Sequence, residues 1–146
     1  MSNKRPEKIS IIVFSGDMNK VHYALAMASA SAAIDIPATL LFTMEATRAL
    51  IDSPRNAGQY LPADGKVKTK KPGDDINKAT KKHMVATFEE LIQACISLEV
   101  KIMVCEMGLK ALNIDRKALR GDIPIKTGGL VTFFNDASAN GQIIFI

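Results

Sequence analysis

The stretch "KIMVCEMGLKAL", residues 101–112, changes its hydrophobic pattern near its middle. Residues 102–105 are continuously apolar, which is typical of a strand covered on both faces of a parallel sheet. A helical spacing begins directly after that run. The stretch therefore predicts a buried strand that turns into a helix over residues 106–112, with Cys105 at the junction.

The same alternation continues on either side of this stretch. Apolar runs rich in β-branched residues predict further buried strands at 9–14, 36–43 and 142–146. Helical segments are predicted at 18–34, 44–51, 87–98 and 128–139. Strands that alternate with helices predict an α/β fold, a parallel sheet with helices on both faces.

Residues 52–80 interrupt this alternation with three prolines, three glycines and several lysines. An irregular segment of this length is usually a functional excursion or a mobile part of a domain. With 146 residues and 47% hydrophobic content, the chain is expected to form one globular domain over residues 1–146. We expect the basic excursion to lie near the opening above Cys105, where its lysines would attract an anionic cargo.

Composition excludes several classes of protein. Two cysteines, without a C-x-x-C pair or a Cys/His spacing suited to zinc, predict reduced thiols, no metal site and no cofactor. The apolar run at the N-terminus is too short for a signal peptide, so a cytoplasmic protein without a membrane span is expected. The seven lysines between Lys66 and Lys82 have neither arginine nor an aromatic residue among them, which disfavours a nucleic-acid surface.

Ligands of parallel α/β sheets bind at the carboxyl ends of the strands. Three predicted loops meet at that edge: "SGDMN" after the first strand, "TME" after the second and "CEMG" after the third. The candidate binding residues in them are Ser15, Gly16, Asp17, Thr43, Met44, Glu106, Met107 and Gly108.

The two cysteines receive different interpretations. Cys105, at a strand end and before a helix, meets unpaired backbone amides that favour a thiolate, although a small buried hydrophobe remains an alternative. Cys95 lies on the apolar stripe of the helix at 87–98, which favours packing. The two positions are expected to be too far apart for a disulfide, which requires Cα atoms within about 7 Å.

Three blocks of the sequence, "KISIIVFSGDMNKVHYALAMASASAAIDIPATLLFT", "VKIMVCEMGLKALNI" and "GGLVTFFNDASANGQIIFI", resemble the DsrE/DsrF-like family, and in particular its peroxiredoxin-like branch. The resemblance covers nearly the whole chain outside residues 52–80. It implies a flavodoxin-like fold, a three-layer sandwich, and a role in cytoplasmic sulfur trafficking. The chain has no Pro-x-x-x-Thr-x-x-Cys motif, so the resemblance does not imply peroxide reduction.

The resemblance also implies the role of each cysteine and the partners. Family members hold sulfane sulfur or thiosulfate on a cysteine that Cys105 matches, and some have a second cysteine that Cys95 matches, which gives Cys95 a secondary role. Homo-oligomers, as trimers or multiples of trimers, TusA-like carriers and heterodisulfide-reductase-like complexes are the implied partners. A sulfur carrier or sulfurtransferase is therefore one hypothesis. The alternative is a non-catalytic module that binds a small anion or a nucleotide.

Overall fold

The computed structural model describes residues 4–51 and 72–146, with only the backbone described for 72–76. Its described strands form one parallel sheet in the order β4-β3-β2-β1-β5. The strands are β1 (Ile9–Val13), β2 (Ala38–Phe42), β3 (Lys101–Cys105), β4 (Ile125–Gly128) and β5 (Gln142–Phe145).

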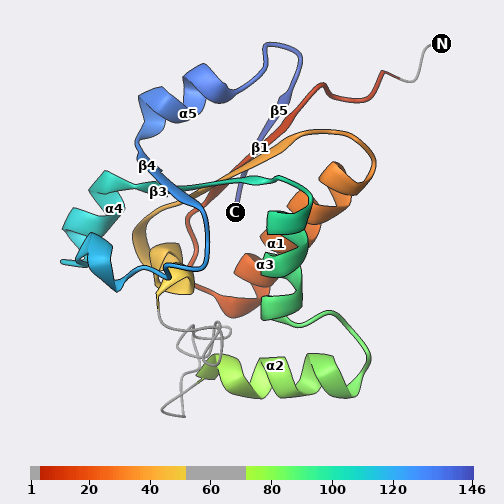
Figure 1. The fold of residues 1–146 in the computed structure, drawn as a ribbon, viewed down its shortest axis with the longest axis vertical. Coiled ribbons are helices and arrows are strands. Elements are labelled where there is room, and N and C mark those ends of the chain that lie inside the picture. Colours follow the sequence, from red (N-terminus) through yellow and green to blue (C-terminus); the bar gives the residue numbers. More distant parts are fainter. Residues whose placement is uncertain (1–3, 52–71) are drawn as a thin grey trace.

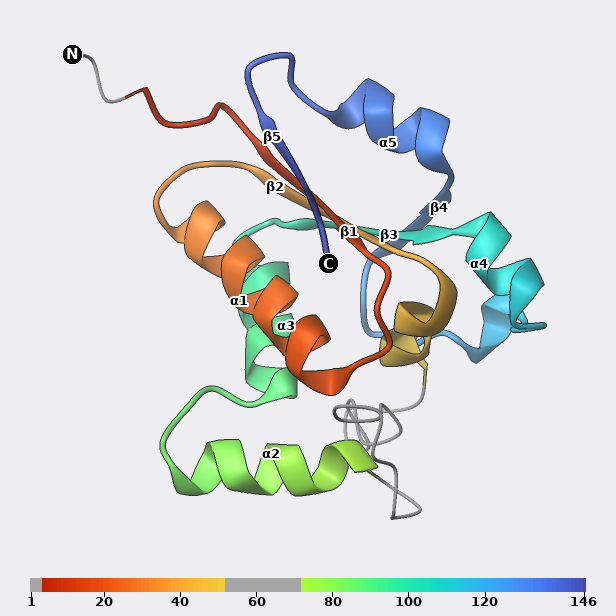
Figure 2. The same ribbon diagram turned by 180° about the vertical axis from the view of Figure 1, so that it is seen from behind.

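Helices cover the two faces of this sheet unequally. They are α1 (Met18–Ala33), α2 (Pro72–Lys82), α3 (Phe88–Ser97), α4 (Glu106–Ala111) and α5 (Leu130–Asp136), with 3-10 helices η1 (Met44–Leu50) and η3 (Arg116–Ala118). Figures 1 and 2 show α1 and α3 on one face and α5 on the other. This arrangement confirms the predicted α/β sandwich of flavodoxin-like type.

Local sequence signals explain where two of the helices begin. The Asp17 side chain accepts hydrogen bonds from the backbone N–H groups of Asn19 and Lys20 at the start of α1. At the start of α3, Thr87 and Glu90 form a capping box, in which each side chain accepts a hydrogen bond from the other's backbone N–H. Both caps satisfy amides that a helix leaves without intrahelical partners.

The strands divide their side chains between two hydrophobic clusters of different size. In β3, Ile102 and Val104 join the large cluster beneath α1 and α3. Met103 and Cys105, which alternate with these two residues along the strand, lie in a small cluster with Leu41 and Phe133. Alternation along a strand sends successive side chains to opposite faces. Cys105 therefore belongs to the face that α5 covers.

The structure corrects three predictions. The short edge strand β4 was missed, because its sequence IKTG contains one strongly apolar residue. The segment at 142–146 is an edge strand and not a buried one, with Phe145 65% exposed. The helix predicted at 87–98 ends at Ser97, so that Leu98 is its C-cap residue and is 40% exposed.

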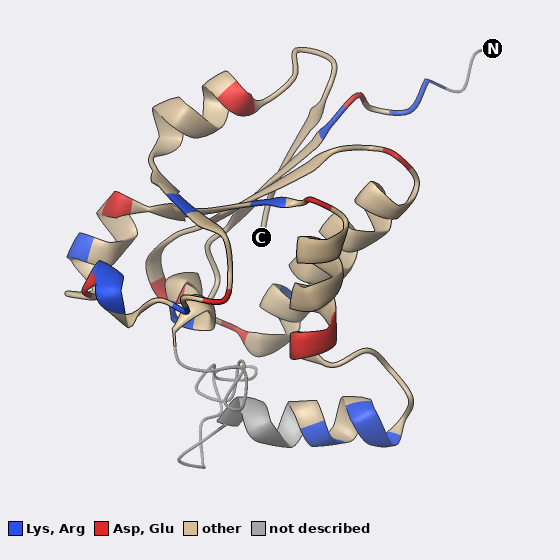
Figure 3. Ribbon diagram, viewed as in Figure 1, with Lys and Arg blue, Asp and Glu red and all other residues tan. Residues whose placement is uncertain are grey.

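The predicted irregular excursion at 52–80 is wrong for its last part, which forms the start of α2. Its prolines and glycines obscured that helix, although Pro72 at the first helical position is a common start. Figure 3 shows basic residues on α2, which contacts α1. The expected position and mobility of 52–71 lie outside the described residues. Among the helices that the structure describes, none combines the length and apolar character needed to cross a membrane.

Candidate functional site

The site begins at the junction between β3 and α4. Cys105 is both the last residue of β3 and the N-cap residue of α4. Its side chain is a free thiol that makes no capping hydrogen bond to the helix, and the residue is only 4% exposed. At the end of an apolar strand, Cys105 thus has a thiol that faces inward and is not hydrogen-bonded to the first turn of α4.

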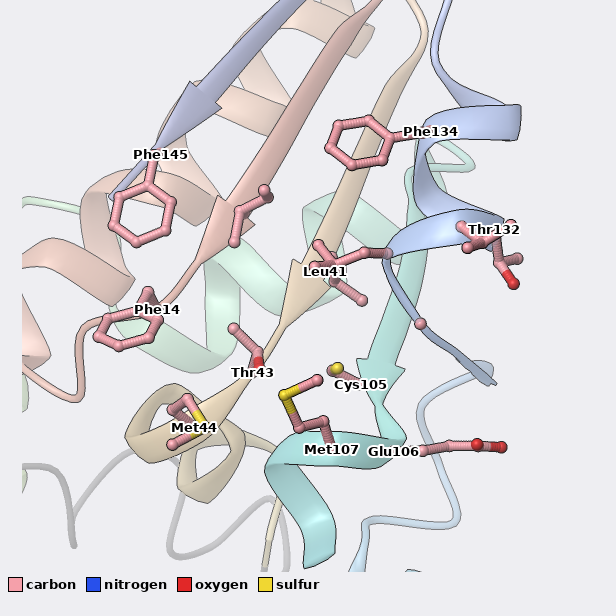
Figure 4. A pocket seen from close by; sticks show the side chains of 14 residues that line it. Phe14, Leu41, Thr43, Met44, Cys105, Glu106, Met107, Thr132, Phe134 and Phe145 are labelled. Carbon is pink, nitrogen blue, oxygen red and sulfur yellow. The ribbon is translucent and has the colours of Figure 1, made fainter. Parts of the chain in front are cut away.

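A cavity of about 880 Å³ lies beside this thiol. Its floor comes from the sheet, where Ile12 of β1 pairs with Leu41 of β2 and Thr43 directly follows β2. Met44 of η1 and Met107 of α4 form one wall (Figure 4). The cavity therefore combines a nucleophile with a lining that is mostly carbon and thioether sulfur.

The structure brings five of the predicted site residues together at this cavity. They are Thr43, Met44, Cys105, Glu106 and Met107. They come from the ends of β2 and β3, which are neighbours in the sheet. The functional roles assigned to them from the sequence remain predictions.

The other predicted binding residues lie outside the lining. Ser15 accepts a hydrogen bond from the backbone N–H of Asp17 at 3.1 Å, so that loop organises the start of α1. A Cβ on Gly16 would lie 2.7 Å from the Cβ of Glu45, so the glycine permits the β1–α1 loop to pass close to η1. These residues shape the surrounding loops.

Gly108 supports the cavity from behind. A Cβ at this position would lie 2.6 Å from the backbone nitrogen of Met44. The missing side chain lets α4 approach η1 closely, which holds both methionines at one cavity wall. Met44 itself has a φ of 48°, a left-handed conformation that is costly for a residue with a side chain. Such strained backbone is concentrated at functional sites.

The wall opposite the methionines was missed from the sequence. It consists of Leu130, Val131 and Phe134 of α5, and the cavity also touches Phe14 and Phe145. The ring centroids of Phe14 and Phe145 lie 5.3 Å apart. Recognition of β4 was the missing signal, because α5 follows that strand and therefore starts at the same carboxyl edge as α4.

A polar cluster holds α5 in this position. Asp136 forms ion pairs with Lys101 and with Lys8, the latter at 2.6 Å, and accepts a hydrogen bond from Thr39 at 2.6 Å. Burial alone would raise the pKa of Asp136, but the hydrogen bonds from the two lysines and the threonine outweigh it and hold that pKa well below its usual range. The C-terminal end of α5 is therefore attached to three strands, through Lys8 just before β1, Thr39 in β2 and Lys101 at the start of β3.

Cys95 lies on the opposite side of the sheet. It is fully buried in the large cluster, and its thiol donates a hydrogen bond to the backbone carbonyl of Leu25 at 3.5 Å. Burial raises the pKa of the Cys95 thiol to about 12. These contacts support packing, while the secondary role that the resemblance implied for Cys95 remains untested.

No group of His, Cys, Asp or Glu side chains in the described part of the chain is arranged to hold a metal ion. The chemistry available at the cavity is that of its thiol. A thiolate attacks sulfur electrophiles, exchanging one S–S bond for another.

Three comparisons place this chain among known proteins. Residues 53–145 match the DsrE/DsrF/DrsH-like family. The protein YrkE of Bacillus subtilis (strain 168), described as uncharacterized, is 28% identical over 162 residues, covering 98% of this chain and 99% of YrkE. The crystal structure of the YchN protein from E. coli has the same fold, with a TM-score of 0.55 at 11% identity over 96% of this chain and 99% of YchN.

Proposed function

The chain belongs to the DsrE/DsrF/DrsH-like family, and from that premise we propose that it is a sulfur carrier, or a sulfurtransferase acting as one, that holds sulfane sulfur or thiosulfate on Cys105. Membership supports a sulfur-related role at the level of the family. The observation that carries the finer proposal is the free Cys105 thiol beside a cavity of about 880 Å³. A cysteine needed only for packing would require no such space.

Loading is a thiol exchange on sulfur. The Cys105 thiolate attacks the outer sulfur of a persulfide donor, so that a new S–S bond forms on Cys105. The S–S bond of the donor breaks, and its electron pair leaves with the donor thiolate. The thiol proton passes to solvent, and no external oxidant or reductant is needed. Cavity walls around the adduct would limit attack by unrelated thiols.

A module that binds a small anion or a nucleotide is the weaker candidate. Anion sites use cationic side chains or rows of backbone amides. None of the described residues that line the cavity is lysine, arginine or histidine. A carrier also differs from a binder in one measurable way, since its activity is lost when its thiol is alkylated.

Assembly and partners are part of the same proposal. Exposed apolar side chains gather at the end of the chain, among them Val131, Ile143 and Phe145. Large exposed patches of this kind mark interfaces. A cytoplasmic homo-oligomer, a trimer or a multiple of one, is therefore proposed, with TusA-like carriers and heterodisulfide-reductase-like complexes as partners. A single species near the chain mass of 15.8 kDa in light scattering would refute the oligomer.

The test of the function is direct weighing of the protein. Reduced full-length chain is incubated with polysulfide and its intact mass is measured without reductant. We expect mass increases in steps of about 32 Da, one sulfur atom each. Cys105→Ser should abolish them, and Cys95→Ser should retain most of them. Loss of the adduct in the Cys95 variant alone would reverse the assignment, and no adduct from any donor would refute the carrier.

A further inference from the structure

The cavity beside Cys105 has a mostly apolar lining with few ionisable side chains. Among its described lining residues, the ionisable side chains are Cys105 and Glu106. The Glu106 side chain is exposed and extends away from the thiol in Figure 4. The space in front of the Cys105 sulfur is therefore bounded by Leu41, Thr43 and Met107, and none of the described residues brings a cationic side chain to it.

An anionic donor would lose hydration in this space, and no described side chain of the lining is a cation that could compensate it. Moving an ion from water into apolar surroundings is strongly unfavourable unless a partner of opposite charge receives it. Thiosulfate and tetrathionate each have two negative charges. The described lining offers them the hydroxyls of Thr43 and Thr132 and carries its own carboxylate.

An uncharged sulfur chain fits the same space well. It needs no counter-charge, and its polarizable atoms gain dispersion energy from carbon and thioether neighbours. Met44 and Met107 provide two thioethers at one wall, and the absence of a Cβ at Gly108 lets that wall form. The volume of about 880 Å³ exceeds what a single sulfur atom on Cys105 would occupy.

We propose that Cys105 takes its sulfur from an uncharged, apolar sulfane-sulfur species, an elemental sulfur ring or a dialkyl polysulfane, in preference to thiosulfate-type anions. This inference rests on the proposed carrier function and narrows its cargo. The Cys105 thiolate attacks one sulfur of the ring, a new S–S bond forms and one ring S–S bond breaks. The electron pair of the broken bond stays on the far end of the opened chain, and the thiol proton passes to solvent. Atoms and electrons balance without a further reactant.

The experiment compares two donors on the full-length reduced protein. Octasulfur, dispersed from acetone, is the uncharged probe, and tetrathionate, which leaves a thiosulfate group on a thiol, is the anionic one. Loading of Cys105 is followed by intact mass, and each rate is divided by the rate for N-acetylcysteine, a thiol without a cavity. We expect the normalised rate to favour octasulfur by about tenfold or more, because the cavity desolvates its ligand.

Substitutions at the cavity wall test whether the lining causes this preference. Phe134 lines the cavity but is 54% exposed, so it can be changed without emptying the core. Phe134→Lys should lower the preference for octasulfur about tenfold by giving the anion a partner. Phe134→Leu, which keeps the wall apolar, should leave it unchanged. Tyr23→Lys places the same charge at an exposed position on α1, away from the cavity, and should also leave it unchanged.

The outcomes separate this inference from the function on which it rests. Equal or faster normalised loading by tetrathionate, or no response to Phe134→Lys, would overturn the apolar cargo and leave a Cys105 carrier standing. Failure of both donors to load Cys105 in the folded protein would overturn the carrier itself.

Discussion

The two faces of the sheet differ although the same strands supply both. The face under α1 and α3 is a closed core, in which Phe42 and Phe88 are fully buried. The face under α5 has a cluster of four buried residues, and several large apolar side chains beside it are exposed. The first face provides the stability of the fold, and the second places the buried Cys105 thiol beside its cavity.

The difference follows from the lengths of the covering helices. On the core face, α1 and α3 contain 16 and 10 residues and contact each other. On the other face α5 contains 7 residues, too few to cover five strands. A parallel sheet is normally buried on both sides. One strand, β3, thus supplies Val104 to a sealed core and Cys105 to an open cavity.

The largest effect is expected from truncating one phenylalanine on each face. Phe88→Ala, in the core, should lower the free energy of unfolding by about 3–5 kcal/mol through lost burial and a new void. Phe134→Ala, on the open face, should cost less than about 1 kcal/mol. Urea unfolding monitored by circular dichroism measures both. Equal losses would mean that α5 is packed as tightly in solution as α3, for example against a second copy.

The next effect concerns the reactivity of the two thiols. With its pKa at about 12, Cys95 at pH 8 should form roughly a thousandfold less thiolate in the native protein than an ordinary cysteine does. Iodoacetamide should therefore label Cys105 in the native protein and both cysteines in urea. Peptide mapping by mass spectrometry identifies the labelled residue. Rapid native labelling of Cys95 would contradict the sealed core.

A smaller effect is expected where α5 is fixed to the sheet. Asp136→Asn should cost about 1–3 kcal/mol, because it weakens the ion pairs with Lys8 and Lys101. The pKa of Asp136 is lower in the folded state than in the unfolded state. The stability that its charge contributes is therefore complete above the unfolded-state pKa of about 3.9, and it is lost as the pH falls toward the folded-state pKa. Urea midpoints measured from pH 7 down to pH 2 should fall more steeply for the wild type than for the variant. Parallel curves would show that Asp136 does not stabilise the folded state through its charge.

The smallest effect comes from the start of α5. Gly129, its N-cap residue, makes no side-chain cap, and a Cβ there would meet nothing within 4 Å. Gly129→Ser should therefore stabilise the protein by roughly 0.3 kcal/mol, since serine caps better than glycine. Gly129→Ala, which adds the Cβ without the hydroxyl, is the control. A stabilisation as large in the alanine variant would mean that chain stiffness, and not capping, is responsible.

Much of the closed face could be predicted from the sequence. Its strands are apolar runs, and the helix predicted at 87–98 agrees with α3 to within one residue at each end. The position of Cys105 at a strand end also followed from its neighbours. These signals are local, so the sequence alone is sufficient to read them.

The open face was harder to predict because its features are not local. The strand β4 reads as polar, and without it α5 could not be placed at the edge that holds Cys105. Phe145 was interpreted as buried because it lies in an apolar run, whereas its burial depends on what covers the strand. The contact between Gly108 and Met44 joins segments that are distant in sequence, and no sequence pattern near Gly108 predicts it.

The sheet also separates the two cysteines of the chain, and this affects how long a loaded state would last. A persulfide on one cysteine is discharged when a nearby thiol attacks it, forming a disulfide and releasing hydrogen sulfide. Cys95 lies beneath the opposite face of the sheet from Cys105, so it cannot perform this reaction within one folded chain. On the proposed function, sulfur held on Cys105 would therefore leave to a thiol that enters the cavity from outside. The lifetime of the loaded state would then depend on how often an acceptor thiol reaches the cavity, and not on a reaction within the chain itself.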